Sequence, residues 1–342
     1  MKDRRTPCRT VVAVASASAC VLLAGCSDNS SPDEPDSVSV EPLAGVDSPQ
    51  LSTPPSGSVT AFPSGLHFTT FDASTRSVVA LDDSGTTLLM FDADDIDAQP
   101  RSVTLPAAPA DIVPTGDGSL LLPMAGELAI VDLRSWEVET VPVDGSLLSA
   151  ARLQDGRIAT GDDSGTIHII DTETNESQTI TGLSSVDALA STRYGLAALD
   201  RNQTSLTKID IDGGSLGLAL RAGTGAARVD TDEYGRILVT DAAGSELLVY
   251  SSEDLLLRQR FPVGTQPWAL TYDDKSDIVW VSTPGDNEVV GYTLDTGIPV
   301  EAGRFSTVRQ PDSIAVDSET GDLYVGSAVG EGLQKVAPGE RI

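Results

Sequence analysis

From about residue 66 to the C terminus, the chain repeats one pattern of short strands and turns. Each copy holds an apolar strand, a turn rich in Asp and Gly, a second strand, a Gly/Asp/Ser turn, a third alternating strand and a more polar fourth strand. The first tight turns fall at Thr75, Gly118, Gly156, Gly195, Gly235, Ser276 and Gly321. Their mean spacing is 41 residues. Helical solenoids are excluded, because no segment keeps a 3.6-residue apolar period.

Four short strands in about 40 residues are the period of a β-propeller blade. Seven copies therefore predict an all-β fold, a seven-bladed β-propeller over residues 58–342. The last copy lacks a fourth strand, because only six residues follow Val336. At the other end, Ser58-Val59-Thr60 parallels the outer strand of the next copy. Residues 58–62 are thus predicted to complete the last blade and close the ring, which removes an open sheet edge.

The clearest copies lie in residues 267–327. They contain a strand-turn-strand run, Ile278–Tyr292, and a Pro-containing lead-in to the next copy, Gln310–Asp317. In these segments the chain resembles the YVTN-type, WD40-like β-propeller family, and the other copies resemble it more weakly. The segment Gly161–Ile167 is also similar to a WD repeat, although the chain has no Trp-Asp pair. These motifs are structural, so the resemblance implies a fold more than an activity.

The N terminus has the pattern of an export signal. Its first residues are basic, at Lys2, Arg4, Arg5 and Arg9. An apolar stretch follows over residues 11–24, shorter than the ~20 residues that span a bilayer. It ends in Leu23-Ala24-Gly25-Cys26, which resembles the lipobox of bacterial lipoproteins. The resemblance implies that residues 1–25 are a signal peptide, that Cys26 carries a diacylglyceryl group, and that its amine takes an acyl chain such as palmitate. An ordinary secretory signal stays open as the alternative.

Two or three acyl chains make a stable anchor, whereas one alone is marginal. The predicted localisation is therefore extracytoplasmic, on the outer face of the cell membrane. Residues 26–57 comprise the lipidated cysteine and a linker rich in Pro, Ser and acidic residues, whose composition predicts flexibility. Cys8 and Cys20 leave with the signal peptide, so Cys26 is the remaining cysteine and no disulfide is expected.

The charge restricts the partners of the chain. Residues 1–25 hold four of the 22 basic and one of the 51 acidic residues, which leaves 18 basic and 50 acidic residues and a net charge of −32. Such a charge disfavours nucleic acid and anionic headgroups. It favours binding of cations or of basic partners, and it is also typical of a highly soluble surface.

Catalytic and metal-binding motifs are sparse. His67 and His168 are the only histidines, which excludes a histidine-rich zinc site. The acidic runs at 92–97 and 210–213 do not fit the twelve-residue calcium loop, and we interpret them as solvated turns. No catalytic residue, metal site or cofactor is predicted. Ca²⁺ held by carboxylates at the channel mouth is the alternative.

In a propeller, the loops that lead into the inner strands form one rim of the central channel. By position, this rim should contain His67, Asp111, Asp187, Arg228, Trp268 and Asp312. Trp268 has two alternatives, a place at the channel mouth and packing between blades. One aromatic ring, two groups able to carry positive charge and three carboxylates suit a polar ligand or a peptide.

These features predict a membrane-anchored envelope lipoprotein whose propeller is a non-catalytic binding or scaffolding module. Its expected partner is an envelope protein or a cell-wall component. The alternative is a lactonase-like or other hydrolase with its site at the channel mouth, so enzymatic activity stays open.

Overall fold

The computed structural model describes residues 41–172, 174 and 176–341. The predicted signal peptide, Cys26 and the first part of the predicted linker lie outside these residues. The described chain is almost entirely β-structure, with 26 strands and one 3-10 helix, η1 (Pro338–Glu340). Within it, no helix is long and apolar enough to cross a membrane.

Five sheets have four strands each. The first contains β2 (Leu66–Asp72), β3 (Ser77–Asp82), β4 (Thr87–Asp92) and β5 (Arg101–Thr104). The next contains β12 (Ala188–Thr192), β13 (Gly195–Asp200), β14 (Ser205–Asp210) and β15 (Ser215–Arg221). It is followed by β16 (Ala226–Thr231), β17 (Arg236–Asp241), β18 (Glu246–Ser251) and β19 (Leu256–Pro262). Another contains β20 (Leu270–Asp273), β21 (Ile278–Thr283), β22 (Glu288–Thr293) and β23 (Val300–Ser306). The last contains β24 (Ser313–Asp317), β25 (Asp322–Gly326), β26 (Leu333–Val336) and β1 (Ser58–Thr60).

The sixth sheet has six strands and holds both the second and the third repeat. Its strands are β6 (Val113–Pro114), β7 (Ser119–Asp132), β8 (Val138–Arg152), β9 (Ile158–Asp162), β10 (Ile167–Asp171) and β11 (Glu176–Ile180). The described chain thus forms six sheets, which corrects the prediction of seven separate ones. The reason is that β7 and β8 are 14 and 15 residues long. Each strand continues through a glycine with positive φ, Gly126 (φ 82°) in β7 and Gly145 (φ 99°) in β8.

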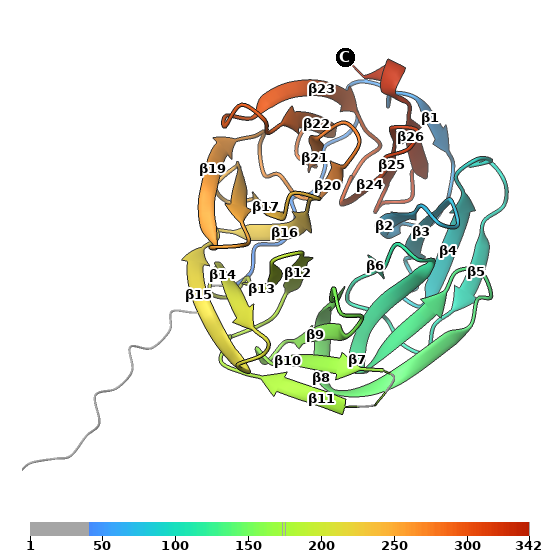
Figure 1. Cartoon of the computed structure of the whole chain (residues 1–342). Helices are drawn as coiled ribbons and strands as arrows, with labels where there is room; N and C mark the ends of the chain where they lie inside the picture. Colours follow the sequence, from blue (N-terminus) through green and yellow to red (C-terminus); the bar gives the residue numbers. More distant parts are fainter. Residues whose placement is uncertain (1–40, 173, 175, 342) are drawn as a thin grey trace, which may run out of the picture. The chain divides into compact units, whose positions relative to one another are not determined.

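The sheets form a ring in which β2, β6, β12, β16, β20 and β24 surround the centre (Figure 1). Middle strands such as β3 and β17 are buried almost throughout, because each sheet packs between two neighbours. Outer strands such as β15 and β19 are mostly exposed. The cores lie between sheets: Trp280 and Phe305 of one sheet pack in one cluster with Leu323 and Val325 of the next. The predicted all-β propeller fold is therefore confirmed.

Aspartates at strand ends fix the turns and account for part of the acidic composition. Asp162 Oδ1 accepts hydrogen bonds from the backbone N–H groups of Ser164 and Thr166. Asp241 accepts from Gly244 in its own turn and from Thr224 and Gly225 in the loop that leads into β16. Short polar side chains that bond to nearby backbone are typical of tight turns. These carboxylates are structural.

The ring closes as predicted. Ser58, Val59 and Thr60 of β1 pair antiparallel with Lys335, Gln334 and Leu333 of β26. The Gln334 side chain is fully buried. It donates to the carbonyls of Ser56 and Ser306 and accepts from Val308 N.

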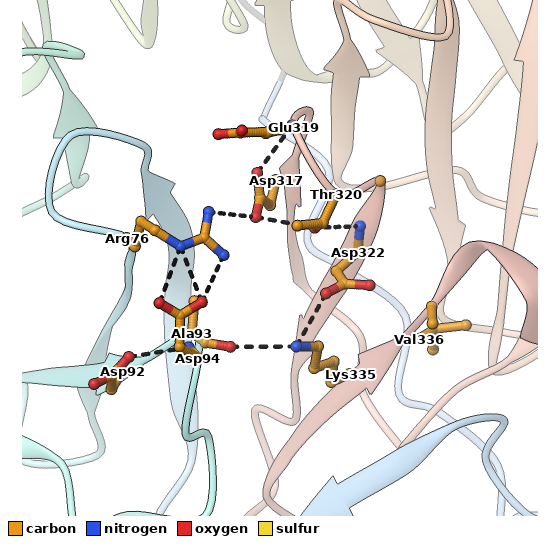
Figure 2. A network of polar contacts seen from close by, with 12 residues as sticks. Arg76, Asp92, Ala93, Asp94, Asp317, Glu319, Thr320, Asp322, Lys335 and Val336 are labelled. Carbon is orange, nitrogen blue, oxygen red and sulfur yellow. Dashed lines mark hydrogen bonds and ion pairs between the residues drawn. The ribbon is translucent and has the colours of Figure 1, made fainter.

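A polar network joins the first and last sheets next to this pairing (Figure 2). Arg76 donates to Asp94 of the first sheet, at 2.9 Å, and to Asp317 of the last, at 3.0 Å. Lys335 pairs with Asp322 at 3.0 Å and donates to the Ala93 carbonyl at 3.2 Å. Asp317 is almost fully buried, so its ion pair with Arg76 is shielded from solvent.

The predicted flexible linker needs correction over its last residues. Residues 43–49, which we call the strap, lie across one face of the ring and are held by hydrogen bonds. Gln310 Nε2 donates to the Val46 carbonyl, Ser48 N donates to Gln310 Oε1, and Asn287 Nδ2 donates to the Pro49 carbonyl. Composition did not reveal this order, because the side chains that hold the strap lie more than 150 residues away.

Candidate functional site

A cavity of about 840 Å³ occupies the centre of the ring. The first strand of every repeat, or the loop leading into it, contributes to its wall. Four of the six predicted rim residues line it: Asp111, Asp187, Arg228 and Asp312. For these four residues, the position within the repeat correctly indicated that the side chain lies at the central cavity.

The other two predicted residues lie beside the cavity. The His67 side chain is 36 % exposed, and its Nε2 lies 3.0 Å from Asp83 Oδ1. The pKa of Asp83 is lowered, first by the hydrogen bond from Gly65 N and then by the bond to His67. Trp268 is 9 % exposed and belongs to the core cluster around Trp280, so blade packing describes it better than open rim.

Two β-bulges shape the cavity wall. In β2, His67 pairs with Leu81 and Thr70 with Val79, so two residues, including Phe68, oppose one. In β16, Ala226 pairs with Asp241 and Val229 with Val239, so two residues, including Arg228, oppose one. Bulges redirect side chains and are frequent next to functional sites. Phe68 and Arg228 both line the cavity as a result.

The Arg228 guanidinium lies between two aromatic rings. Its central carbon is 5.7 Å from the centroid of Phe68 and 5.9 Å from that of Trp268. Thr240 Oγ1 fixes this arrangement, because it accepts from Arg228 N and donates to the Trp268 carbonyl. Cation–π contacts leave the N–H groups of a guanidinium available for other partners.

Two carboxyl groups of the cavity are shifted toward their neutral forms. Burial raises the pKa of Asp111, opposed by the charge of Arg228. Burial also raises the pKa of Asp312, opposed by the hydrogen bond from Gln310 and by Arg228 and His67. The third carboxylate of the cavity, Asp187, accepts hydrogen bonds at Oδ2 from Arg201 N at 2.7 Å and from Ser185 Oγ at 2.5 Å.

Sequence analysis missed Arg201, the second cation of this end of the cavity. Its Nη2 donates to the Leu43 carbonyl of the strap at 2.5 Å and its Nε donates to the Ala226 carbonyl at 3.0 Å. Burial lowers the pKa of Arg201, opposed by Asp187. A signal did exist, because Arg201 lies in a loop between the second and third strands, one of the two loop types that form this rim.

Toward the other end of the inner strands, the Asp230 carboxyl group also lines the cavity and has a raised pKa. Burial raises its pKa to about 7, although its carboxylate accepts hydrogen bonds from Thr231 N and Tyr272 N that oppose the shift. The charges of Asp274 and Asp232 add to the increase. A carboxyl group that titrates near neutral pH in a cavity is a candidate proton acceptor.

Within residues 41–172, 174 and 176–341, no group of three His, Cys, Asp or Glu side chains could hold a metal ion. The acidic run at 92–97 shows why. Asp92 accepts from Asp94 N, Asp94 pairs with Arg76, and Asp97 accepts from Thr60 Oγ1. The Ca²⁺ alternative has no such group to support it in this part of the chain.

No protein-family model matches the chain, and no curated protein matches its sequence. Solved structures do match. Kuenenia stuttgartiensis hydrazine synthase is 15 % identical with a TM-score of 0.67, over 83 % of this chain and 98 % of that one. A chain of the mitotic checkpoint complex is 17 % identical with a TM-score of 0.69, over 87 % and 98 %. A streptogramin B lyase is 14 % identical with a TM-score of 0.65, over 83 % and 94 %. At such identities the likeness shows the β-propeller fold alone.

Proposed function

We propose that this protein is a lipid-anchored envelope lipoprotein whose propeller binds a protein or cell-wall ligand, without catalysis, at the mouth of its central cavity. The observation that carries the proposal is the convergence of Asp111, Asp187, Arg201, Arg228 and Asp312 on one cavity. Ligand sites in ring-shaped folds are concave and hold a few convergent polar groups. A chain of the mitotic checkpoint complex has the same fold, which agrees with a role in protein binding.

The strap limits the distance between the cavity mouth and a lipid anchor at Cys26. Sixteen residues lie between Cys26 and Leu43, and a chain of that length reaches at most about 60 Å. Leu43 is bound by Arg201 at the cavity. An anchor at Cys26 would therefore keep this mouth within about 60 Å of the membrane surface.

We also propose that the six-stranded sheet works as two blades, which gives seven in all. Two observations support this. Residues Leu128–Val131 of β7 pair with Val138–Val141 of β8, and later residues of β8, Ala150–Arg152, pair with β9. Gly145 (φ 99°) falls between these two pairings along β8, and Gly126 (φ 82°) falls between the β6 and β8 pairings along β7.

The anchor is tested by Cys26→Ser. The variant should lose the lipid and appear in the soluble fraction, whereas the parent partitions into detergent. Fractionation of cells expressing each form, followed by mass spectrometry of the N-terminal peptide, measures this. A variant that partitions like the parent would contradict lipidation at Cys26.

Ligand capture is tested by Asp111→Asn/Asp312→Asn in the full-length protein. The change keeps side-chain shape but removes two carboxyl groups and their acceptor oxygens from the cavity, so capture of envelope components by cross-linking should fall at least fivefold. The control, Asp212→Asn/Asp295→Asn, removes two charges from exposed turns and should capture like the parent. Equal loss in both variants, or in neither, would mean that the cavity is not the site.

One observation favours a second candidate, a hydrolase: Asp230 has a pKa near 7 and lines the same cavity. Turnover of a lactone or ester panel that Asp230→Asn abolishes would replace the binding module with an enzyme.

A further inference from the structure

We propose that Phe68, Arg228 and Trp268 form a clasp for the C-terminal carboxylate of a peptide. The inference rests on the proposed binding function and names the ligand class of that site. It is independent of the lipid anchor.

The first step is the state of the Arg228 side chain. Among the described residues, its guanidinium forms no hydrogen bond and no ion pair. Its charge nevertheless acts on Asp111 and Asp312, where it opposes the increase in pKa. The two flanking rings hold it in place without using its donors. A guanidinium fixed in this way presents a planar fork of N–H groups, which matches a carboxylate in two parallel hydrogen bonds.

The second step is backbone strain at the partner ring. Phe68 has φ 53°, a left-handed conformation that glycine adopts readily and that is unfavourable for a bulky residue. Such strain costs of order 1–3 kcal/mol and persists where the surrounding structure imposes it, often at ligand clamps. Here the strained residue is the one whose ring stacks on Arg228.

The third step is the occupant already seated at this mouth. The strap is a peptide segment that the ring holds mainly through its backbone, together with the Ser48 hydroxyl and the packed Leu43 side chain. Arg201 donates to the Leu43 carbonyl, and Gln310 binds both the Val46 carbonyl and Ser48 N. The backbone of Gly45 lies against the Trp268 ring, with a Cβ position 3.5 Å from it. This end of the cavity is therefore built to recognise peptide backbone.

The remaining cavity groups fit a peptide end. Asp111 and Asp312 offer acceptors for the amide N–H groups next to a terminal carboxylate. The same two groups, with Asp187, disfavour binding of an isolated anion. A bound carboxylate must therefore be held by the free N–H groups of Arg228. A carboxylate with adjacent N–H donors satisfies both requirements.

The test uses full-length protein in detergent and two pools of random tetrapeptides, one with free C-terminal carboxylates and one with C-terminal amides. The free-carboxylate pool should be retained at least tenfold better. A retained sequence, made in both forms, should lose at least tenfold in affinity on amidation. Arg228→Ala should cause a similar loss for the carboxylate form and leave amide binding unchanged. Arg228→Lys should recover part of the loss, because it keeps the charge but not the fork.

Arg152→Ala is the matched control. Arg152 also lines the cavity, near the end of its inner strand, and forms no side-chain hydrogen bond among the described residues, so its removal changes the net charge equally. It should bind the peptide like the parent. Thermal unfolding of all three variants checks that the ring is intact.

Equal retention of both pools, retention of neither, or undiminished binding by Arg228→Ala would overturn the clasp. Displacement of the peptide by inorganic phosphate or galacturonate at lower concentration than by peptide carboxylate would also overturn it, because the site would then be a general anion or acidic-sugar site. The outcomes separate the two proposals. Envelope capture that needs Asp111 and Asp312 but not Arg228 removes the clasp alone, whereas capture that needs none of them removes the proposed function.

Discussion

Deleting residues 43–62 should lower the free energy of unfolding by about 3 kcal/mol or more, whereas deleting residues 27–40 should leave it unchanged. The first deletion removes the strap and β1 together, and β26 becomes an open edge. Leu333 and Val336, now fully buried, would lie next to that edge. The buried Gln334 amide would lose its bond to the Ser56 carbonyl. The bond to the Ser306 carbonyl would remain, so one N–H of the amide would lose its acceptor, and an unpaired buried donor costs about 1–3 kcal/mol.

The measurement is thermal unfolding of the two deletion variants and the parent in the same detergent. A loss of this size corresponds to a midpoint lower by about 5–10 °C. A synthetic peptide of residues 43–62, added in trans, should restore much of the difference, because it can pair with β26 and refill the strap positions. The network of Figure 2 is intact in the deletion variant, so partial closure through Arg76 and Asp317 should keep the ring folded. Equal midpoints for both deletions would show that the closing strand does not stabilise the ring.

The fold and its closure could be predicted because their signals are local. Alternating strands and Asp-Gly turns repeat at one period, and the missing fourth strand of the last copy is visible as an unmatched segment at residues 58–62. The number of sheets could not be obtained in this way. Whether β7 and β8 bend at Gly126 and Gly145 or break there depends on backbone geometry, which the residue type permits but does not decide.

Part of the candidate site could likewise be predicted from local sequence, and part of it could not. Asp111, Asp187, Arg228 and Asp312 were predicted because one position per repeat leads to the cavity. Phe68 was missed because a bulge, invisible in the residue pattern, turns its side chain toward Arg228. The strap was missed because its polar, Pro-rich composition is that of a linker, while its order comes from Gln310 and Asn287, which are distant in sequence.

The stability of the ring should fall as the pH rises from about 4 to 7, by up to about 4 kcal/mol from Asp230 alone. Burial raises the pKa of Asp230 from 3.8 to about 7 in the folded chain. In this window the unfolded carboxyl group has released its proton and the folded one has kept it. The folded state then binds more protons, so the free energy of unfolding decreases with pH and becomes constant above about 7.

Asp230→Asn isolates this contribution, since asparagine is neutral at every pH. Its single side-chain oxygen can accept from Thr231 N or from Tyr272 N but not from both, which costs about 1 kcal/mol independently of pH. Denaturant unfolding of parent and variant from pH 4 to 8 gives a difference curve. The variant should start slightly less stable at pH 4 and become more stable than the parent by pH 7.

Asp94→Asn is the control of opposite sign. The hydrogen bond from Arg76 lowers the pKa of Asp94, so this carboxylate contributes stability above its unfolded pKa and loses it as the pH falls. The Asp94 variant should therefore lose stability relative to the parent as the pH rises through the acid range. Parallel curves for the parent and Asp230→Asn would mean that the Asp230 carboxyl group is ionised in the folded protein. Water or a cation in the cavity would then have to stabilise its charge, and the argument for a proton acceptor matched to neutral pH would end.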